Sequence, residues 1–419
     1  MSGAAHIVGG GVAGLAAAYE TAVAGRRTVV YEAAPQLGGR CRTVVGPDGF
    51  SHDNGTHALL SCNTAATGFL KAIGALGDWV EPEPDGLPMV DARTGTARCV
   101  GLSPFSWLDP NRRPAGFAAA DLVRLAAAAL PLRDRPVAAR FAASGLAGTF
   151  VDPLAVAVLN TRSEMASSRR LGHVLRRLAR PGAARLMIPR RGLGPDMIEP
   201  AERALGRHGA TIAFNARLRA LAVADERVVR LDFGFGSVAV APEDMVILAL
   251  PPHEVSRLMP ELATPAAFES IAGVHFALRG PAAPRLVGIT GGLSQWVALR
   301  EACASVTISA ASDLDRADLA DRVWPEVRAA RLCVGLDASE AAPDARVLIE
   351  RRATIRHAVG DPIGFPRTRV ENLVFAGDWG GPLPATIEAA VASGRAAGRR
   401  RIHASRRSKR PSALREAAI

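Results

Sequence analysis

The feature that most constrains this chain is a glycine-rich turn between an apolar strand and a helix near its start. Residues 5–33 read AHIVGGGVAGLAAAYETAVAGRRTVVYEA, which places Gly9, Gly11 and Gly14 in a G-x-G-x-x-G spacing. The first glycine permits a tight turn, the second lets the backbone approach a pyrophosphate, and the third lets the helix pack on the sheet. Glu32 ends the second strand, where a carboxylate can accept both hydroxyls of a ribose. The sequence therefore predicts a dinucleotide-binding unit.

The start of the predicted helix should hold the phosphates. Unpaired N–H groups and the positive end of the helix dipole make a helix N-terminus a binding site for anions. A glycine-rich turn alone is common in proteins, so the complete order of strand, turn, helix, strand and acid carries the prediction. The expected dinucleotide contacts at this end of the chain are Gly9, Gly11, Val12, Ala13, Gly14, Glu32 and Ala33.

A second glycine element follows in the stretch PQLGGRCRT, residues 35–43. Enzymes that use nicotinamide have no need of such an element shortly after Glu32, and a surface turn with a solvated Arg is the simpler alternative. The stretch resembles the FAD-binding signature of the amine oxidase and phytoene desaturase superfamily. That resemblance implies FAD as the cofactor, with Gly39 beside the ribityl chain and Arg40 near the pyrophosphate.

A strand near the C-terminus ends in Gly377 and Asp378, within the stretch NLVFAGDWGGPLPATIEAAVASGRAAGR. In the superfamily that this chain resembles, such a strand returns to the first domain and closes the cofactor site. Asp378 would then accept a hydrogen bond from a ribityl hydroxyl. The helix that begins near Thr386 and Ile387 would direct its positive end at the flavin ring, which favours the reduced, anionic form. A plain helix cap is the alternative role for Asp378, although a proline-rich corner separates it from that helix.

These elements predict an α/β fold, with a Rossmann-like FAD-binding domain of the glutathione reductase and amine oxidase type and an interleaved α+β substrate-binding domain. By the resemblance, Leu218 would lie beside the adenine. The FAD-binding domain should be discontinuous and take residues 1–80, 190–252 and 345–400. The substrate-binding domain should take 81–189, which reads as largely helical, and 253–344, which contains strand-like runs.

The charge of the chain is concentrated at its end. The formal net charge is +11, and residues 395–419 alone hold nine Arg or Lys against one Glu. The rest of the chain has little excess charge, so a nucleic-acid partner is not expected. We expect a basic, disordered tail at 401–419. Its charge reflects either a compositional bias toward Arg or adhesion to an anionic membrane surface.

Nothing in the sequence directs the chain across a membrane. Apolar stretches of about 18 residues or more without charge or proline do not occur, and the start, MSGAAHIVGGG, lacks the basic region and cleavage site of an export signal. The cysteines are far apart and form neither a metal-ligand set nor a disulfide pattern: Cys41, Cys62, Cys99, Cys303 and Cys333. We therefore expect a cytoplasmic protein without a metal, at most peripheral on the inner face of the cell membrane.

Five stretches together resemble a single family: DNGTHALL (53–60), DPLAVAVLNTRSEMAS (152–167), SQWV (294–297), VTISAAS (306–312) and AGDWGGPLPATIEAAVASG (376–394). They resemble the hydroxysqualene dehydroxylases, also described as squalene-associated FAD-dependent desaturases. The similarity runs from about residue 5 to residue 400. Two positions depart from the family pattern, because Thr56 stands where Gln is expected and Gly10 where Ala is usual. Neither removes a group that the chemistry needs.

The resemblance implies that reduced FAD converts hydroxysqualene to squalene in hopanoid-type triterpenoid biosynthesis. The allylic alcohol ionises once its hydroxyl is protonated or hydrogen-bonded, and hydride from the flavin quenches the cation. The protein must supply a dry apolar tunnel and a proton donor near the hydroxyl. An external electron donor must reduce the FAD.

The loop after the second glycine element supplies the candidate proton donor, His57, because it should pass beside the flavin ring. A structural, hydrogen-bonded histidine is the alternative. Asn160 and Thr161 could orient the substrate hydroxyl, or could cap the end of a helix. Asp53 is expected to fix the loop by accepting backbone N–H bonds. The loop also supplies further expected cofactor contacts: Asp53, Gly55 and Thr56.

Two enzymatic alternatives use the same scaffold with hydride moving toward FAD. An amine oxidase needs an aromatic pair around the amine, but Tyr19 and Tyr31 are the only tyrosines and both lie in the first dinucleotide-binding unit. A carotenoid-type desaturase has an equally apolar substrate and stays open. A non-catalytic carrier of prenyl chains on this fold is the alternative from another class. Retention of FAD by the purified protein would separate that carrier from the enzymes.

Overall fold

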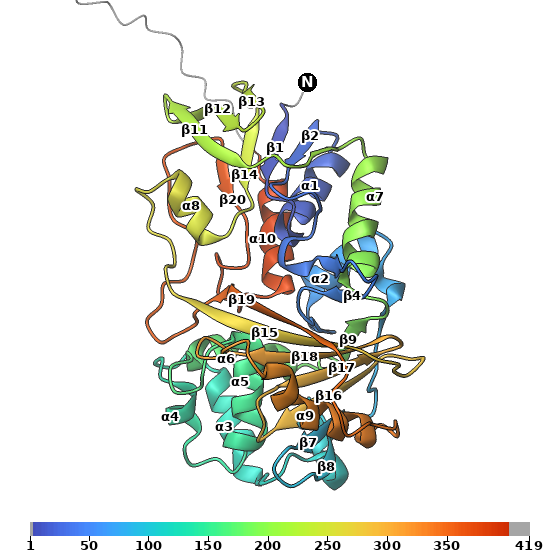
Figure 1. Ribbon diagram of the computed structural model, residues 1–419. Coiled ribbons are helices and arrows are strands. Elements are labelled where there is room, and N and C mark those ends of the chain that lie inside the picture. Colours follow the sequence, from blue (N-terminus) through green and yellow to red (C-terminus); the bar gives the residue numbers. More distant parts are fainter. Residues whose placement is uncertain (1–2, 402–419) are drawn as a thin grey trace, which may run out of the picture.

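A parallel sheet of five strands forms the centre of the first domain, the predicted FAD-binding domain. The computed structural model describes residues 3–401 (Figure 1). The strand order is β10-β2-β1-β14-β20, and every neighbouring pair is parallel. The strands are short and mostly buried, as parallel strands covered on both faces are: β1 (Ala5–Val8), β2 (Thr28–Tyr31), β10 (Thr211–Ala213), β14 (Met245–Leu248) and β20 (Leu373–Phe375). This sheet confirms the predicted α/β class.

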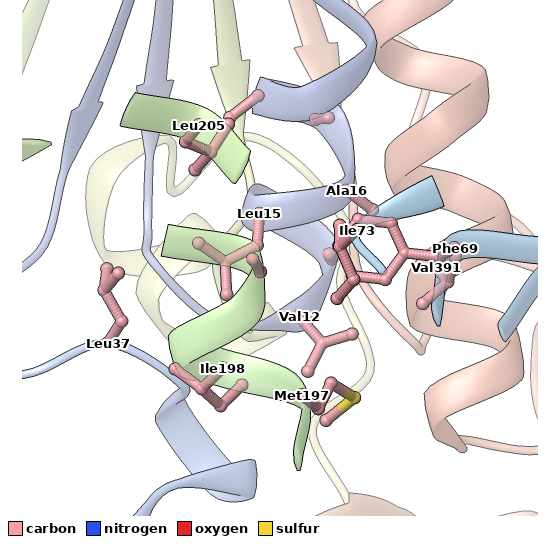
Figure 2. Close-up of a cluster of buried hydrophobic side chains, with 14 of the residues drawn as sticks. Val12, Leu15, Ala16, Leu37, Phe69, Ile73, Met197, Ile198, Leu205 and Val391 are labelled. Atoms are coloured by element: carbon pink, nitrogen blue, oxygen red, sulfur yellow. The ribbon is translucent and has the colours of Figure 1, made fainter. Parts of the chain in front are cut away.

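Four helices pack around one face of this sheet: α1 (Val12–Val23), α2 (Thr64–Ala72), α7 (Glu199–Arg207) and α10 (Ile387–Arg399). Their contact surface is the cluster of buried apolar side chains that Figure 2 shows around Val12 and Leu15. Helices α1 and α10 approach very closely, because a methyl group at Gly394 would lie 2.1 Å from the Ala13 carbonyl oxygen. Within residues 3–401, the last helix is therefore held against the first.

A sheet of seven strands forms the second domain, below the first in Figure 1. Its order is β19-β15-β18-β17-β16-β7-β8. Helix α9 (Leu319–Cys333) packs on one face of it, over Val274, Phe276 and Val306. The strands are β7 (Leu87–Asp91), β8 (Ala97–Val100), β15 (Phe268–Ala277), β16 (Arg285–Thr290), β17 (Trp296–Arg300), β18 (Cys303–Ser309) and β19 (Ala345–Ile355).

A helical subdomain completes the second domain at the end far from β1 and β2 (Figure 1). Its own apolar cluster includes Trp107, Leu125, Phe141 and Leu171. The helices are α3 (Ala119–Ala129), α4 (Val137–Phe141), α5 (Asp152–Leu159) and α6 (Ser168–Leu178), with short turns at η3 (Pro104–Leu108), η4 (Pro110–Arg112) and η5 (Ala147–Val151). This agrees with the helical interpretation of residues 81–189, except that β7 and β8 join the large sheet.

Smaller elements complete the fold. They include a hairpin of β3 and β4, a three-stranded sheet of β5, β9 and β6, and a separate sheet of β11, β12 and β13. Their bounds are β3 (Thr43–Val45), β4 (Ser51–Asp53), β5 (Leu59–Leu60), β6 (Trp79–Val80), β9 (Leu186–Pro189), β11 (Leu218–Ala224), β12 (Arg227–Phe233), β13 (Gly236–Ala239), α8 (Pro252–Leu258), η1 (Gly39–Cys41), η2 (Leu76–Asp78) and η6 (Gly194–Ile198).

One predicted domain boundary is wrong. The third piece of the FAD-binding domain was expected to begin at 345, but β19 (Ala345–Ile355) pairs along its length with β15 in the second domain. The chain returns to the first domain only after Ile355, because β15 offers β19 an open edge for pairing. Of the predicted tail at 401–419, all but Arg401 lies outside the described residues. Within residues 3–401 no helix combines the length and the apolar character needed to cross a membrane.

Candidate cofactor and substrate site

The first glycine-rich turn forms an open cradle at the start of α1. Gly9 adopts φ +106°, and a methyl group at Gly14 would lie 1.8 Å from the Gly9 carbonyl oxygen. At Gly11, by contrast, a methyl group would meet no described atom within 4 Å. Gly11 is also the N-cap of α1. Because it has no side chain, no side-chain hydrogen bond caps the first N–H groups of the helix. The first turn of α1 thus keeps space and N–H groups for a phosphate.

Glu32 lies beside this cradle with both carboxylate oxygens fixed. One oxygen accepts the Gly10 N–H at 2.7 Å and the other accepts the Ala34 N–H at 2.8 Å. A methyl group at Gly10 would come within 2.9 Å of the Glu32 carboxylate and 2.5 Å of Leu37 Cδ2. Glycine at this position, a departure from the resembled family, therefore lets the carboxylate approach the backbone.

The segment expected beside the adenine also lies here. The Ala216 N–H donates to the Glu32 carbonyl oxygen at 2.8 Å, so Leu218, two residues later, begins β11 close to the end of β2. Leu218 is buried in the cluster that contains Val8 and Tyr31. The adenine contact expected of Leu218 stays a prediction.

The second glycine element joins the two ends of the chain. Gly38 and Gly39 adopt φ +104° and +54°. These values turn the chain so that the Arg40 side chain reaches residues near the C-terminal end of the fold. The Arg40 guanidinium donates to the Asp378 carboxylate at 2.9 Å and also to the Ala353 carbonyl oxygen. Burial opposes the charge of Arg40, but Asp378 outweighs it and raises the pKa of the guanidinium above its ordinary value. The sequence predicted a cofactor contact for Arg40 and for Asp378, but not that the two would pair with each other.

The start of α10 is held from both domains. Thr386 is its N-cap and accepts the Ala389 N–H at 3.4 Å, and Ile387 is buried. Glu388 accepts the Ala66 N–H at the start of α2 and pairs with Arg177 of α6 at 2.9 Å. Gly377, just before Asp378, is tied to α10 through Ser393 at 2.9 Å. The strand end and the helix start that were predicted to close the site are thus fixed together.

A buried histidine missed by the sequence analysis supports this helix start. His357 Nε2 accepts the Ala385 N–H at 2.9 Å, one residue before the N-cap of α10. Its Nδ1 must therefore carry the hydrogen, and this atom has no hydrogen-bond partner among the described residues. Burial, with a smaller contribution from Arg170, lowers the pKa of His357 to about 3. A lone histidine in a loop gives no sequence signal for such a role.

Asp53 anchors the start of the loop of residues 53–57 to other segments, and its partners lie outside the loop. One oxygen accepts the Thr43 hydroxyl and the Leu193 N–H, both at 2.8 Å, and the other pairs with Arg300 of β17 at 3.1 Å. Both charged groups are buried. This ion pair joins the hairpin of β3 and β4 to the large sheet. Arg300 was missed, because an Arg at a strand end reads as a surface residue.

His57 lies on this loop with one ring nitrogen occupied. Its Nδ1 is 2.9 Å from the Gly55 carbonyl oxygen, which can only accept, so Nδ1 carries the hydrogen. Nε2 makes no hydrogen bond within the described residues and is a bare acceptor in the neutral ring. Burial lowers the pKa of His57 below its ordinary value, and the Gly55 carbonyl offsets this only in part. The neighbouring Thr56 hydroxyl is buried and lacks a partner in the described part of the chain.

Asn160 and Thr161 do not present free polar groups. Asn160 ends α5 at φ +45°, donates to Thr354 at 2.9 Å and accepts the Ala310 N–H at 2.7 Å. The Thr161 hydroxyl donates to the Leu159 carbonyl at 3.1 Å and accepts the His357 N–H at 3.0 Å. Their hydrogen bonds join α5 to the large sheet and to the loop before α10. Thr161 thus bonds at the end of α5, as the alternative expected, whereas Asn160 bonds to other segments; a substrate-orienting role for either stays a prediction.

Taken together, the cradle fits FAD. Gly11 leaves open space at the start of α1, Glu32 accepts the Gly10 N–H beside it, and Thr56 holds a buried hydroxyl without a partner among residues 3–401. Asp378, the expected ribityl contact, is buried and pairs with Arg40, the expected pyrophosphate contact, whose side chain is partly exposed.

Solved structures share the fold over nearly the whole chain. An oxidoreductase from Methanosarcina mazei matches with a TM-score of 0.68 at 15% identity, covering 94% of this chain and 99% of that one. Putrescine oxidase with bound putrescine matches with a TM-score of 0.61 at 15% identity, covering 95% and 98%. At this level of identity the comparison establishes the fold alone.

Sequence comparisons are more specific. The family described as flavin containing amine oxidoreductase matches residues 12–400. Hydroxysqualene dehydroxylase of Sinorhizobium fredii is 35% identical over 93% of this chain and 96% of its own length. The protein of the same name from Rhodopseudomonas palustris is 36% identical over 94% and 97%. The chain therefore belongs to the flavin containing amine oxidoreductases, whose cofactor here is FAD, and within them to the hydroxysqualene dehydroxylase family.

Proposed function

We propose that this protein reductively removes the hydroxyl group of hydroxysqualene and releases squalene. The observation that carries the proposal is the match to proteins named hydroxysqualene dehydroxylase over 93–94% of the chain, at 35% and 36% identity. The residues of the cofactor cradle support it, because the glycine turn and Glu32 lie at the start of α1, and Asp378 precedes α10, which packs against α1.

Reduced FAD, when bound, supplies the hydride that replaces the hydroxyl. The first turn of α1 at Gly11 would hold the pyrophosphate, Glu32 the adenosine ribose and Asp378 the ribityl chain. Because each turnover consumes two electrons, an external electron donor must act with this protein. The second domain would cover the apolar chain of the substrate and exclude water from the reacting carbon.

His57 is the proposed partner of the substrate hydroxyl. Its free Nε2 can contact that group while Nδ1 is held by Gly55. The neutral ring can only accept a hydrogen bond at Nε2, so a proton donor role requires the imidazolium form. Burial disfavours that form, which confines the donor role to acidic conditions and gives it a distinct pH signature.

The amine oxidase alternative has no support from the tyrosines. Tyr19 lies on α1 against Phe69, and Tyr31 ends β2 against Phe233 and hydrogen-bonds His6 at 3.1 Å. Both rings pack against other side chains of the first domain. An aromatic pair around an amine would therefore have to come from other residue types.

Incubation of the purified protein with hydroxysqualene and chemically reduced FAD, without oxygen, tests the proposal. Mass spectrometry of the extract should show squalene, and the same mixture with oxidised FAD should show none. Unchanged hydroxysqualene under reducing conditions would refute the dehydroxylase. Loss of hydrogen from an added isoprenoid in the presence of oxidised FAD would point to the desaturase alternative.

We further propose that the protein works in the cytoplasm at the inner face of the cell membrane. The support is the apolar substrate and the basic composition of residues 401–419, at about 1 kcal/mol per basic residue near an anionic surface. Deletion of residues 402–419 should reduce cosedimentation with anionic vesicles. Unchanged sedimentation would assign the tail to compositional bias.

A further inference from the structure

Helix α3 presents an apolar face to solvent, which we call the α3 face: Ala119, Leu122, Val123, Ala126 and Leu130 just after its end. Val123 is 70% exposed and Leu130 57% exposed. The opposite side of α3 is already buried, with Asp121, Leu125 and Ala128 turned inward. Helix α6 packs there so tightly that a methyl group at Gly172 would lie 2.5 Å from the Ala128 carbonyl oxygen. The α3 face is therefore a second apolar side of the helix.

The spacing of the α3 face is that of a buried stripe. Its members follow one another at i, i+3, i+4, i+7 and i+11, which places them along one side of the helix. A helix at the surface of a soluble protein normally carries polar residues on its outward side. An outward side without a charge calls for an apolar partner.

Exposed apolar side chains continue this face across two neighbouring segments. We call them the rim: Leu132, Met165, Val359 and Ile363, each at least 40% exposed. Backbone contacts place the three segments side by side, since Pro136 bridges to Ser167 and Ala166 bridges to Ala358. The Val359 N–H also donates to the Met165 carbonyl at 3.1 Å.

The rim borders a hollow at the start of β15, whose lining also includes Arg162, Ser312 and Asp313. Met165 lines this hollow together with Phe268 and Glu269 at the start of β15. Glu269 stands opposite Thr354 on β19. The adjacent Ala353 carbonyl accepts the Arg40 guanidinium. Glu269, which lines the hollow, thus pairs with the strand neighbour of the residue whose carbonyl oxygen accepts from Arg40.

The charges beside the α3 face favour an anionic partner. Residues 119–140 contain four Arg and two Asp, and both carboxylates are used internally. Asp121 is buried and pairs with Arg124. Asp134 accepts the Ser167 hydroxyl at 2.8 Å and the Arg169 N–H at 3.0 Å, at the start of α6. Arg133 and Arg135 remain exposed next to the leucines.

We propose that the α3 face and the rim dock onto an anionic lipid bilayer, from which the substrate enters at the hollow. Apolar side chains with adjacent Arg residues are the composition of a helix that lies in a membrane interface. This inference rests on the proposed function, because hydroxysqualene is itself a membrane lipid. The α3 face lies in the second domain, whereas α10, the last helix within residues 3–401, packs in the first domain (Figure 1).

Cosedimentation of the FAD-loaded full chain with vesicles of phosphatidylcholine and phosphatidylglycerol in equal parts tests the docking surface. The double variant Val123→Asp with Leu130→Asp should lower the bound fraction by at least about tenfold, because two exposed apolar side chains lose their burial. The variant Arg133→Ala with Arg135→Ala should weaken binding to these vesicles and leave binding to pure phosphatidylcholine unchanged. The matched control, Val23→Asp with Val45→Asp, changes exposed valines outside the helical subdomain and should bind like the wild type.

Each measurement has an outcome that overturns the proposal. Unchanged vesicle binding of the Val123→Asp, Leu130→Asp variant, with FAD content and thermal midpoint preserved, would exclude the α3 face. A change from dimer to monomer in that variant, with lipid binding intact, would assign the face to a second copy of the chain. Vesicle binding needs no turnover, so it stands apart from the proposed activity. A wild type that binds vesicles but leaves detergent-solubilised hydroxysqualene unchanged would refute only the dehydroxylase.

Discussion

The guanidinium of Arg40 lies 2.9 Å from the carboxylate of Asp378, although 338 residues of sequence separate them. Asp378 is almost fully buried, whereas the Arg40 side chain is 40% exposed. The pair ties the second glycine element to the strand end before α10. It therefore closes the cofactor cradle with the two charged groups that family resemblance assigns to FAD.

Arg40→Met should leave the buried Asp378 charge without a partner. We expect a loss of about 1–3 kcal/mol in the free energy of unfolding, the cost of an unsatisfied buried charged group that water can partly reach. FAD content after purification should fall as well. Thermal unfolding and the flavin absorbance ratio measure both effects. Arg42→Met, two residues away, is the control. An equal loss of stability and FAD in that variant would mean that the effect does not come from the Arg40–Asp378 pair.

The glycine turn and Glu32, which are close in sequence, could be predicted from the sequence. The contacts between residues far apart in sequence could not. Gly9, Gly11, Gly14 and Glu32 lie in one strand–turn–helix–strand unit, where spacing alone dictates geometry. Arg40 and Asp378 were each assigned to the cofactor, but no spacing rule relates two residues so far apart. The same reason explains the wrong boundary at 345, because the sequence of β19 does not state which sheet edge it joins.

Residues whose roles depend on tertiary burial were also invisible in the sequence. Arg300 becomes a buried partner of Asp53 only because β17 lies beneath the hairpin of β3 and β4. The sequence suggested that the Asn160 amide could bind a substrate, but in the structure this amide is hydrogen-bonded to Thr354 and to the Ala310 N–H. In both cases the deciding contact comes from a different segment of the chain.

The buried pair of Asp53 and Arg300 joins the two domains and should be strongly coupled. Arg300→Met or Asp53→Asn alone should each destabilise the protein by about 3–5 kcal/mol, because the remaining group stays buried and unpaired. The double variant should lose less than the sum of the two. Urea unfolding of all four proteins gives the coupling energy. Additive losses would mean that the two groups act independently.

Two buried histidines predict that stability falls in acid. Burial lowers the pKa of His275 and of His357 to about 3 each, whereas an unfolded histidine titrates near 6.5. Between these values the unfolded chain binds more protons, so the free energy of unfolding decreases as pH falls below about 6.5. The slope should approach about 1.4 kcal/mol per pH unit for each histidine.

Urea unfolding at several values between pH 5 and pH 7 checks this dependence. His357→Gln should reduce the slope, since it removes one titrating group, and its amide oxygen can still accept the Ala385 N–H. His208→Gln changes an exposed histidine and serves as the control. A slope that His357→Gln leaves unchanged would show that this histidine does not titrate on unfolding.

His57 gives the sharpest test of the proposed chemistry. As an acid it must carry a proton on Nε2, and burial lowers its pKa below the ordinary value near 6.5. The competent form is then present only at lower pH, so turnover should rise as pH falls through that lowered pKa and should be small at pH 8. His57→Ala should reduce turnover on the order of 10² to 10⁴-fold, the usual contribution of a positioned general acid. The rise of turnover at low pH, the acidic limb of the pH profile, should disappear in this variant.

Flavin binding separates this role from a structural one. The ring contacts the loop through the Gly55 carbonyl, and His57→Gln can keep that contact through its side-chain amide without supplying an acid. If His57 acts as the acid, both variants should retain FAD and accept electrons from dithionite, yet both should turn over slowly. If His57 only shapes the loop, His57→Gln should recover activity while His57→Ala loses FAD. Normal turnover in both variants, with the acidic limb intact, would place the proton source elsewhere.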